Sequence, residues 1–157
     1  MDAFQAAAME LRLDERIDSV DAERLGRDLA HDAEIRIAWE TAVGDHLTVT
    51  EAVEALGLGS RQAVYQRIQR GTLLAVDLDG QLVLPRYQFG PGRPDRRVAK
   101  VLRLLRGAHL RADSLVSWFA TGQPELEGLT PADWLRRDRD PEALYDAARH
   151  TTGALAH

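Results

Sequence analysis

The hydrophobic residues between positions 47 and 87 follow a helical period twice and then alternate with polar residues as in strands. In the first part, apolar residues three and four positions apart predict a helix with one buried face. These residues are Val49, Ala52, Val53 and Leu56. In the second part, the apolar set Ala63, Val64 and Ile68 predicts another helix, over 61–70.

The ends of these two helices are marked by capping residues and glycines. Thr48 and Glu51 have the spacing of a capping box, which predicts the start of the first helix. The stretch 57–59, Gly-Leu-Gly, is expected to end it, because glycine accepts the left-handed exit from a helix. Ser60 is expected to cap the second helix and Gly71 to end it.

Two short strands are predicted next, over 72–76 and 81–84, joined by the turn sequence Asp-Leu-Asp-Gly at 77–80. The order helix, turn, helix, hairpin is that of a winged helix-turn-helix, whose second helix can lie in the major groove of DNA. The second helix leaves polar residues outside that suit contacts with bases and phosphates. The candidate DNA-binding residues are Arg61, Gln62, Tyr65, Gln66, Gln69 and Arg70.

This stretch resembles the excisionase-like, MerR-related DNA-binding domains. The resemblance covers about forty residues and includes TVTEAVEALGL, SRQAVYQRIQRG, the hairpin and the closing LPRYQF. It implies a winged fold and DNA as a partner. A module of the same shape that binds only protein is the alternative.

Residues 3–44 contain no proline and are predicted to be helical, with a possible break capped near Asp14, Ser19 or Asp21. One apolar stripe is Phe4, Ala7, Ala8 and Leu11, and a second, less regular one is Leu25, Leu29, Ile35, Trp39 and Val43. Such a region packs on a neighbouring domain or on a second copy of itself. A homodimer is the sharper expectation, because helix-turn-helix proteins usually read paired half-sites.

The stretch 88–94 has two prolines and two glycines, and is expected to form neither helix nor strand. Beyond it, Asp95 is expected to cap a helix to about Arg106, and Asp113 one that ends at Phe119. Thr130-Pro131 and Asp140-Pro141 predict two more helix starts, for helices over 132–137 and 142–149. The tail 151–157 has no apolar period and is expected to be mobile.

The predicted fold class is therefore mainly α: N-terminal helices, a winged helix-turn-helix with a short β-hairpin, and a small C-terminal helical bundle. The predicted domains are a helical N-terminal region over 1–46, the DNA-binding domain over 47–90, a linker over 91–94 and a helical domain over 95–157. A hydrophobic content of 45% is ample for folded cores.

The formal net charge of −5 is unevenly distributed. Residues 1–47 carry five arginines against twelve acids, 48–112 carry eleven basic residues against five acids, and 113–157 carry four arginines against eight acids. The positive excess of six thus lies on the predicted helix-turn-helix and what directly follows it. Such a segment between two acidic flanks favours binding to phosphate.

The chain has no cysteine, so a disulfide framework and a thiol nucleophile are excluded, and a reducing cytoplasm is expected. Its opening is acidic where a signal peptide would be basic, and no apolar stretch is long enough for a membrane span. We therefore expect a cytoplasmic protein without a membrane partner.

A second resemblance lies in residues 114–157. Trp118, Pro124, Leu126, Gly128, Thr130, Pro131, Leu135 and Leu144 match the pattern of the toxin-binding domain of the Xre/MbcA/ParS antitoxins. With the preceding helix, the match covers about sixty residues. Gly122-Gln123 stands where the family usually has asparagine, and Asp138-Arg139-Asp140 where it often has glycine.

The resemblance implies an antitoxin of a type II toxin–antitoxin pair that neutralises a RES-domain, NAD-degrading toxin encoded by an adjacent gene. The basic middle of the chain would then bind promoter DNA and repress its own operon. The implied toxin-binding residues are Trp118, Arg149, His150, Thr151, Thr152, Leu155 and His157.

The alternative function is a free-standing DNA-binding transcription regulator or excisionase-like factor without a toxin. An enzyme is disfavoured. Asp138 and Asp140 lack a third metal ligand, and Ser114 with His109 lacks the third group of a catalytic triad. We therefore expect no catalytic residue, no metal and no cofactor.

Overall fold

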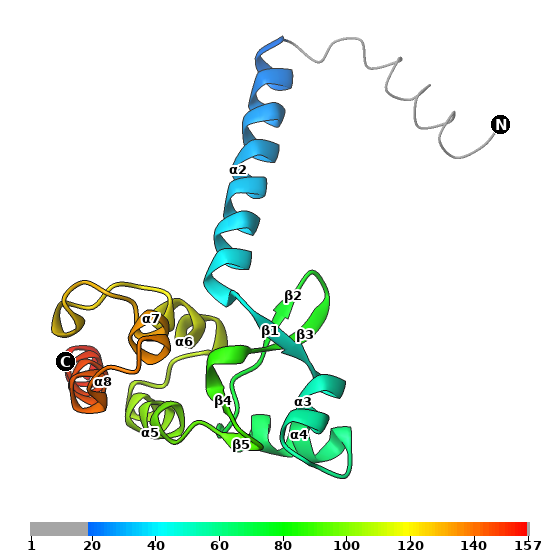
Figure 1. The fold of residues 1–157 in the computed structure, drawn as a ribbon. Coiled ribbons are helices and arrows are strands. Elements are labelled where there is room, and N and C mark those ends of the chain that lie inside the picture. The colour runs from blue at the N-terminus through cyan, green and yellow to red at the C-terminus, as the bar shows by residue number, and fades with distance from the viewer. Residues whose placement is uncertain (1–18, 157) are drawn as a thin grey trace. The chain divides into compact units, whose positions relative to one another are not determined.

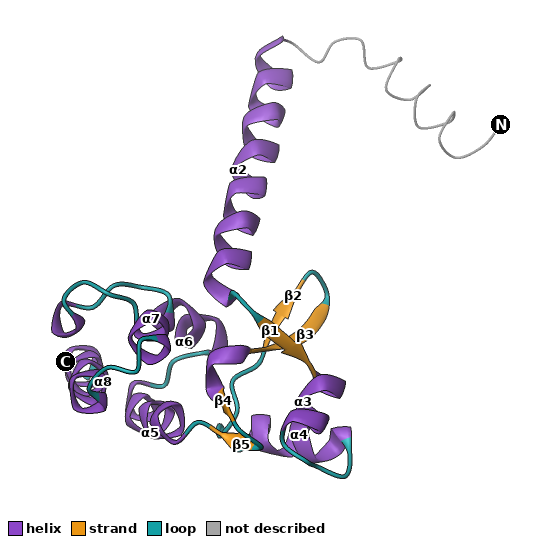
Figure 2. Ribbon diagram, in the orientation of Figure 1, coloured by secondary structure: helices purple, strands orange, loops and turns teal. Residues whose placement is uncertain are grey.

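The computed structural model of the chain describes residues 19–156, and over these the fold is mainly α, as predicted (Figure 1). The described residues form two compact units, one up to Trp39 and one from Glu40 onward. The α-helices are α2 Ser19–Val43, α3 Val49–Ala55, α4 Arg61–Gln69, α5 Arg96–Leu105, α6 Ala112–Phe119, α7 Pro131–Arg136 and α8 Pro141–Leu155. The strands, orange in Figure 2, are β1 His46–Thr48, β2 Val76–Leu78, β3 Gln81–Pro85, β4 Phe89–Gly90 and β5 Arg93–Pro94. Short 3-10 turns are η1 Arg86–Gln88, η2 Arg106–Ala108 and η3 Pro124–Leu126.

The long helix α2 is described from Ser19 onward; Asp21 lies within it and caps no break, and Asp14 lies outside the described residues. Of the second predicted stripe, Val43 is buried, whereas Leu25, Leu29 and Ile35 are more than half exposed. The first predicted stripe, Phe4 to Leu11, lies outside the described residues.

The second unit contains a three-stranded antiparallel sheet with strand order β1-β3-β2. The strand predicted over 72–76 is wrong, because β2 begins only at Val76. Strand β1 was not predicted; its three residues pair with β3, with Leu47 opposite Leu84. A strand this short has one buried side chain, Leu47, and so no visible alternation in the sequence.

The wing turn follows its sequence signal closely. Leu78 lies opposite Gln81, so the turn has two residues, Asp79 and Gly80, and both have positive φ as a type I′ turn requires. The Gly80 amide donates to the Asp77 carboxylate at 2.8 Å.

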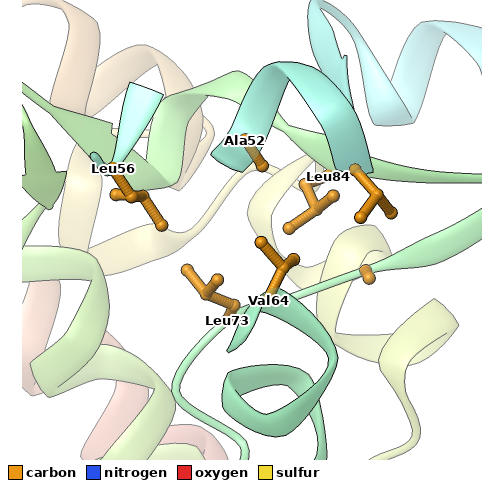
Figure 3. Packing of buried hydrophobic residues seen from close by; sticks show 7 residues of the cluster. Ala52, Leu56, Val64, Leu73 and Leu84 are labelled. Atoms are coloured by element: carbon orange, nitrogen blue, oxygen red, sulfur yellow. The ribbon is translucent and has the colours of Figure 1, made fainter. Parts of the chain in front are cut away.

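The helix-turn-helix packs around a small apolar core. Val64 on α4 points toward Ala52 on α3 and Leu84 on β3 (Figure 3), and Leu56 and Leu73 complete the labelled cluster. Each of these side chains is less than a tenth exposed. The helical spacing of the apolar positions thus fixes which face of α4 is held inward.

The predicted helix ends are confirmed in detail. The Thr48 hydroxyl accepts from the Glu51 amide while the Glu51 carboxylate accepts from the Thr48 amide, both at 3.2 Å. Gly57 and Gly71 end α3 and α4 with positive φ. At each, the glycine amide and the amide after it donate back to helix carbonyls, which is the Schellman arrangement.

The prediction that 88–94 forms neither helix nor strand is wrong. Phe89 pairs with Pro94 and Gly90 with Arg93, so β4 and β5 form a tight hairpin around Gly92, which has positive φ. A Cβ on Gly90 would lie 3.3 Å from the Arg93 carbonyl oxygen. The glycines and prolines here shape a two-residue ladder rather than an open linker.

Gln88 connects this segment to the helix-turn-helix. Its side chain is 2% exposed, and its amide both accepts from the Leu74 amide and donates to the Leu74 carbonyl, each at 2.7 Å. The glutamine thus pairs with Leu74 as a neighbouring strand would. Next to it, the Tyr87 ring stacks on Phe119 of α6 with ring centroids 4.7 Å apart.

The C-terminal helices start where their caps predict. Asp95 accepts from the amides of Arg97 and Val98, and Thr130 accepts from the Asp133 amide. Asp140 likewise caps α8. Asp113 is the exception, since α6 begins at Ala112 with Arg111 as its cap, and Asp113 lies in the first turn.

The predicted mobile tail is wrong for residues 151–155, because α8 continues to Leu155. Thr151 and Thr152 hold this extension against the rest of the unit. The Thr151 hydroxyl accepts from the Trp118 indole at 2.9 Å, and the Thr152 hydroxyl donates to the Leu104 carbonyl at 2.9 Å. These partners are distant in sequence, so no local pattern reveals them.

We predict that Gln88→Leu lowers the free energy of unfolding by at least about 2 kcal/mol, because it leaves two buried main-chain groups of Leu74 without partners. Gln81→Leu, on an exposed position of β3, is the matched control and should change it by less than about 0.5 kcal/mol. Urea unfolding measures both. Equal stability of the two variants would contradict the role given to Gln88.

Candidate nucleic-acid interface

The outer face of α4 brings the predicted DNA-binding residues together. Arg61, Gln62, Gln66, Gln69 and Arg70 are all exposed, and their spacing places them on adjoining rows of one helix face. Val64 on the opposite face is fully buried. The core therefore fixes the rotation of α4 and turns its amide and guanidinium groups outward.

Tyr65 differs from the other candidates. It was predicted to lie largely outside, but it is half-buried and packs against the helix-turn-helix core. Its hydroxyl accepts from the Arg61 guanidinium at 3.3 Å. Tyr65 therefore orients Arg61 as well as presenting its own hydroxyl.

An arginine from outside the helix-turn-helix lies at the carboxyl end of α4. The Arg106 guanidinium donates to the Arg70 carbonyl oxygen at 3.2 Å. A Cβ on Gly71 would lie in ordinary contact with this guanidinium, at 3.4 Å, so it is the positive φ of Gly71, not this approach, that favours glycine. The sequence predicted Arg106 only as the end of the helix capped by Asp95, because nothing local links it to a residue 36 positions earlier.

The wing tip has the opposite charge. The turn between β2 and β3 carries Asp77 and Asp79 and no basic residue. Carboxylates at the tip repel phosphate, so the wing cannot supply the cationic contact that phosphate requires. The interface favoured by charge is α4 with Arg106, not the wing tip.

Several of the basic residues that follow are engaged within the protein. Arg97 forms ion pairs with Asp95 at 2.8 Å and Asp138 at 3.0 Å, and the Lys100 ammonium lies 4.2 Å from the centre of the Tyr145 ring. Arg96 and Arg103 are exposed. The positive excess of this segment thus overstates the charge available to a partner.

This network favours the charged form of Asp95. Partial burial raises the pKa of its carboxyl, but the Arg97 side chain, the amides of Arg97 and Val98, and the Arg97 charge together outweigh burial. The pKa of Asp95 therefore lies below its ordinary value.

The Tyr87 hydroxyl is a separate case. Burial alone raises its pKa, and the hydroxyl has no hydrogen-bond partner within the described protein.

The predicted toxin-binding residues are divided between the interior and the surface. Trp118 is 7% exposed, and its indole N–H binds Thr151. Thr151 and Thr152 are half-buried and hydrogen-bonded within the protein. These three residues hold α8 in place, so little of their surface remains for contact with a partner.

The remaining members lie on the outer side of α8 and at its end. Arg149 pairs with Asp146 at 2.8 Å, and His150 lies 3.5 Å from the Glu125 carboxylate. Leu155 is 57% exposed. His157 lies outside the described residues.

Within residues 19–156, no three histidine, cysteine, aspartate or glutamate side chains gather as metal ligands. None of the helices in the same range has the length and apolar character needed to cross a membrane.

Comparison with known proteins gives one informative likeness. No family model and no curated protein matches the chain. A solved structure, described as the NMR structure of Rv2175c, is similar with a TM-score of 0.60 and 21% sequence identity, over 69% of this chain and 81% of that one. At this identity the likeness shows a shared fold and nothing about function.

We predict that Asp95→Asn lowers the free energy of unfolding at pH 7, because asparagine keeps a cap but loses the ion pair with Arg97. Because the pKa of Asp95 is lower in the folded than in the unfolded state, its carboxylate stabilises the fold fully at pH values above the unfolded pKa of about 3.9. This stabilisation is lost as the pH falls through the folded-state pKa. The difference between the two proteins should therefore shrink below about pH 4. Urea unfolding at several pH values measures it, and a gap that widens at low pH would contradict the assignment.

Proposed function

We propose that this chain binds duplex DNA, with α4 in the major groove, and regulates transcription from its own promoter. One observation carries the proposal: a row of exposed arginine and glutamine side chains lies on a helix whose opposite face is fixed by the core. Arginine pairs bidentately with guanine and glutamine with adenine, so this face has the chemistry to read base edges.

The charges around α4 support the proposal that this helix, and not the wing tip, faces the DNA. Arg106 adds a cation beside Arg70, near the end of the helix. The acidic wing tip then lies away from phosphate, and the contact is made by α4 and its neighbours. Affinity should fall steeply with added salt, because each phosphate contact releases counterions.

We predict that Arg61→Ala and Gln62→Ala each weaken binding to DNA from upstream of the gene by roughly 1–3 kcal/mol, about 5- to 150-fold, for each lost base contact. Fluorescence anisotropy with labelled duplex measures it. Arg149→Ala is the matched control, since it removes the same charge from exposed α8. If Arg61→Ala and Gln62→Ala bind DNA as tightly as Arg149→Ala and the unmodified chain do, α4 does not read bases.

We propose as a second function that the chain is the antitoxin of a RES-domain toxin encoded by an adjacent gene. Leu155 supports it: among residues 40–156, it is the one strongly exposed large apolar side chain, and it lies at the end of α8, one turn or more beyond Arg149 and His150. An exposed apolar side chain near polar ones on the same helix suits a protein contact. The toxin would meet an ordered helix end rather than a mobile tail.

If the neighbouring reading frame encodes such a toxin, its expression should lower cellular NAD and growth, and this chain should restore both. We predict that Leu155→Ser removes protection, whereas Ile35→Ser, an exposed apolar residue on α2, keeps it. Deleting residues 151–157 is a poorer test, because it also removes two hydrogen bonds that hold α8. A harmless neighbour would leave the DNA-binding regulator as the function.

A further inference from the structure

Four large apolar side chains of α2 are more than half exposed, namely Leu25, Leu29, Ile35 and Ile37, and of these Leu25 and Leu29 lie one turn apart on the same face. Leu25 and Leu29 are 56% and 61% exposed. At helical spacing they share a stripe with small residues, which are Ala22, Gly26 and Ala33. A helix in a protein usually gains most of its stability when such a stripe packs against another part of the structure, and α2 has 25 residues.

The stripe has the heptad spacing of a coiled coil, and its small and large residues are unevenly placed along it. Positions 22, 26, 29, 33 and 36 follow the alternating spacing of four and three residues that forms a coiled-coil seam. The first two are Ala22 and Gly26, which leave space. Near the other end is Arg36, which needs space for a long charged side chain.

We propose that α2 pairs antiparallel with α2 of a second copy of this chain, along the stripe Ala22, Gly26, Leu29, Ala33 and Arg36. In this register Leu29 of one copy lies opposite Ala33 of the other, and Arg36 lies opposite Gly26. Large side chains thus meet small ones at both of these levels. Leu25 flanks the seam and is covered by the partner.

Charge decides between the two directions of pairing. A parallel pair places identical residues at each level, so Arg36 would face Arg36 of the other copy across the seam. Two like charges that face each other across the seam repel and destabilise the pair. The antiparallel pair separates the two arginines and places each over a glycine. Because the stripe matches itself in this register, large residue against small, a second copy is the occupant that it complements. The inference does not depend on DNA binding.

Sedimentation equilibrium of the full chain tests the pairing. We expect a dimer whose dissociation constant rises at least about 100-fold in Leu29→Ser, because both copies lose a buried leucine. Ile35→Ser is the matched control, since Ile35 is 54% exposed on the same helix but off the stripe, and it should dimerise normally. A monomeric chain, or a dimer that Leu29→Ser leaves intact, overturns the proposal.

Disulfide trapping tests the direction, and the chain suits it because it has no cysteine. Mixed Gly26→Cys and Arg36→Cys chains should crosslink under mild oxidation. Gly26→Cys alone should not, since the two cysteines lie about 15 Å apart along the axis in the antiparallel register. Efficient crosslinking of Gly26→Cys alone would establish a parallel pair and overturn the register.

Discussion

The two hydrogen bonds between the Gln88 side chain and the main chain of Leu74 hold the second unit together. Leu74 lies in the loop between α4 and the wing, next to Leu73 in the helix-turn-helix core. Gln88 lies in η1, next to Tyr87, which stacks on Phe119 of α6. One buried amide therefore joins the loop after the candidate recognition helix to the segment that leads into the C-terminal helices. Without it, two main-chain groups would be buried unpaired, which a folded interior rarely tolerates.

The sequence predicted those parts of the fold that depend on neighbouring residues. The capping box at Thr48, the caps Ser60 and Thr130, and the glycines that end α3 and α4 act within one helical turn. Two of the parts it did not predict depend on distant partners. Strand β1 exists because Leu47 pairs opposite Leu84, and the end of α8 because Trp118 and Leu104 bind Thr151 and Thr152. The β4–β5 hairpin is local, but its glycines and prolines indicated a break rather than a two-residue ladder.

The candidate site, too, could be predicted where it depends on local helical spacing and not where it depends on distant contacts. Helical spacing placed the residues of α4 on one face, and the structure presents five of the six on the surface. Tyr65 is the exception, because its ring fills space beside the core while its hydroxyl meets Arg61. Charge counting along the chain could not show that Arg97 and Lys100 are engaged by Asp95 and Tyr145, or that Arg106 reaches Arg70. Those contacts define which part of the basic segment can meet a partner.

Contact between the outer face of α4 and DNA is tested most directly by backbone amide shifts of the isotope-labelled full chain on addition of duplex DNA from upstream of the gene, at low salt. We expect shifts concentrated in residues 60–70, smaller ones around Arg106, and unchanged amides in the second half of α8. Shifts confined to α8, or none at any DNA concentration, would contradict it.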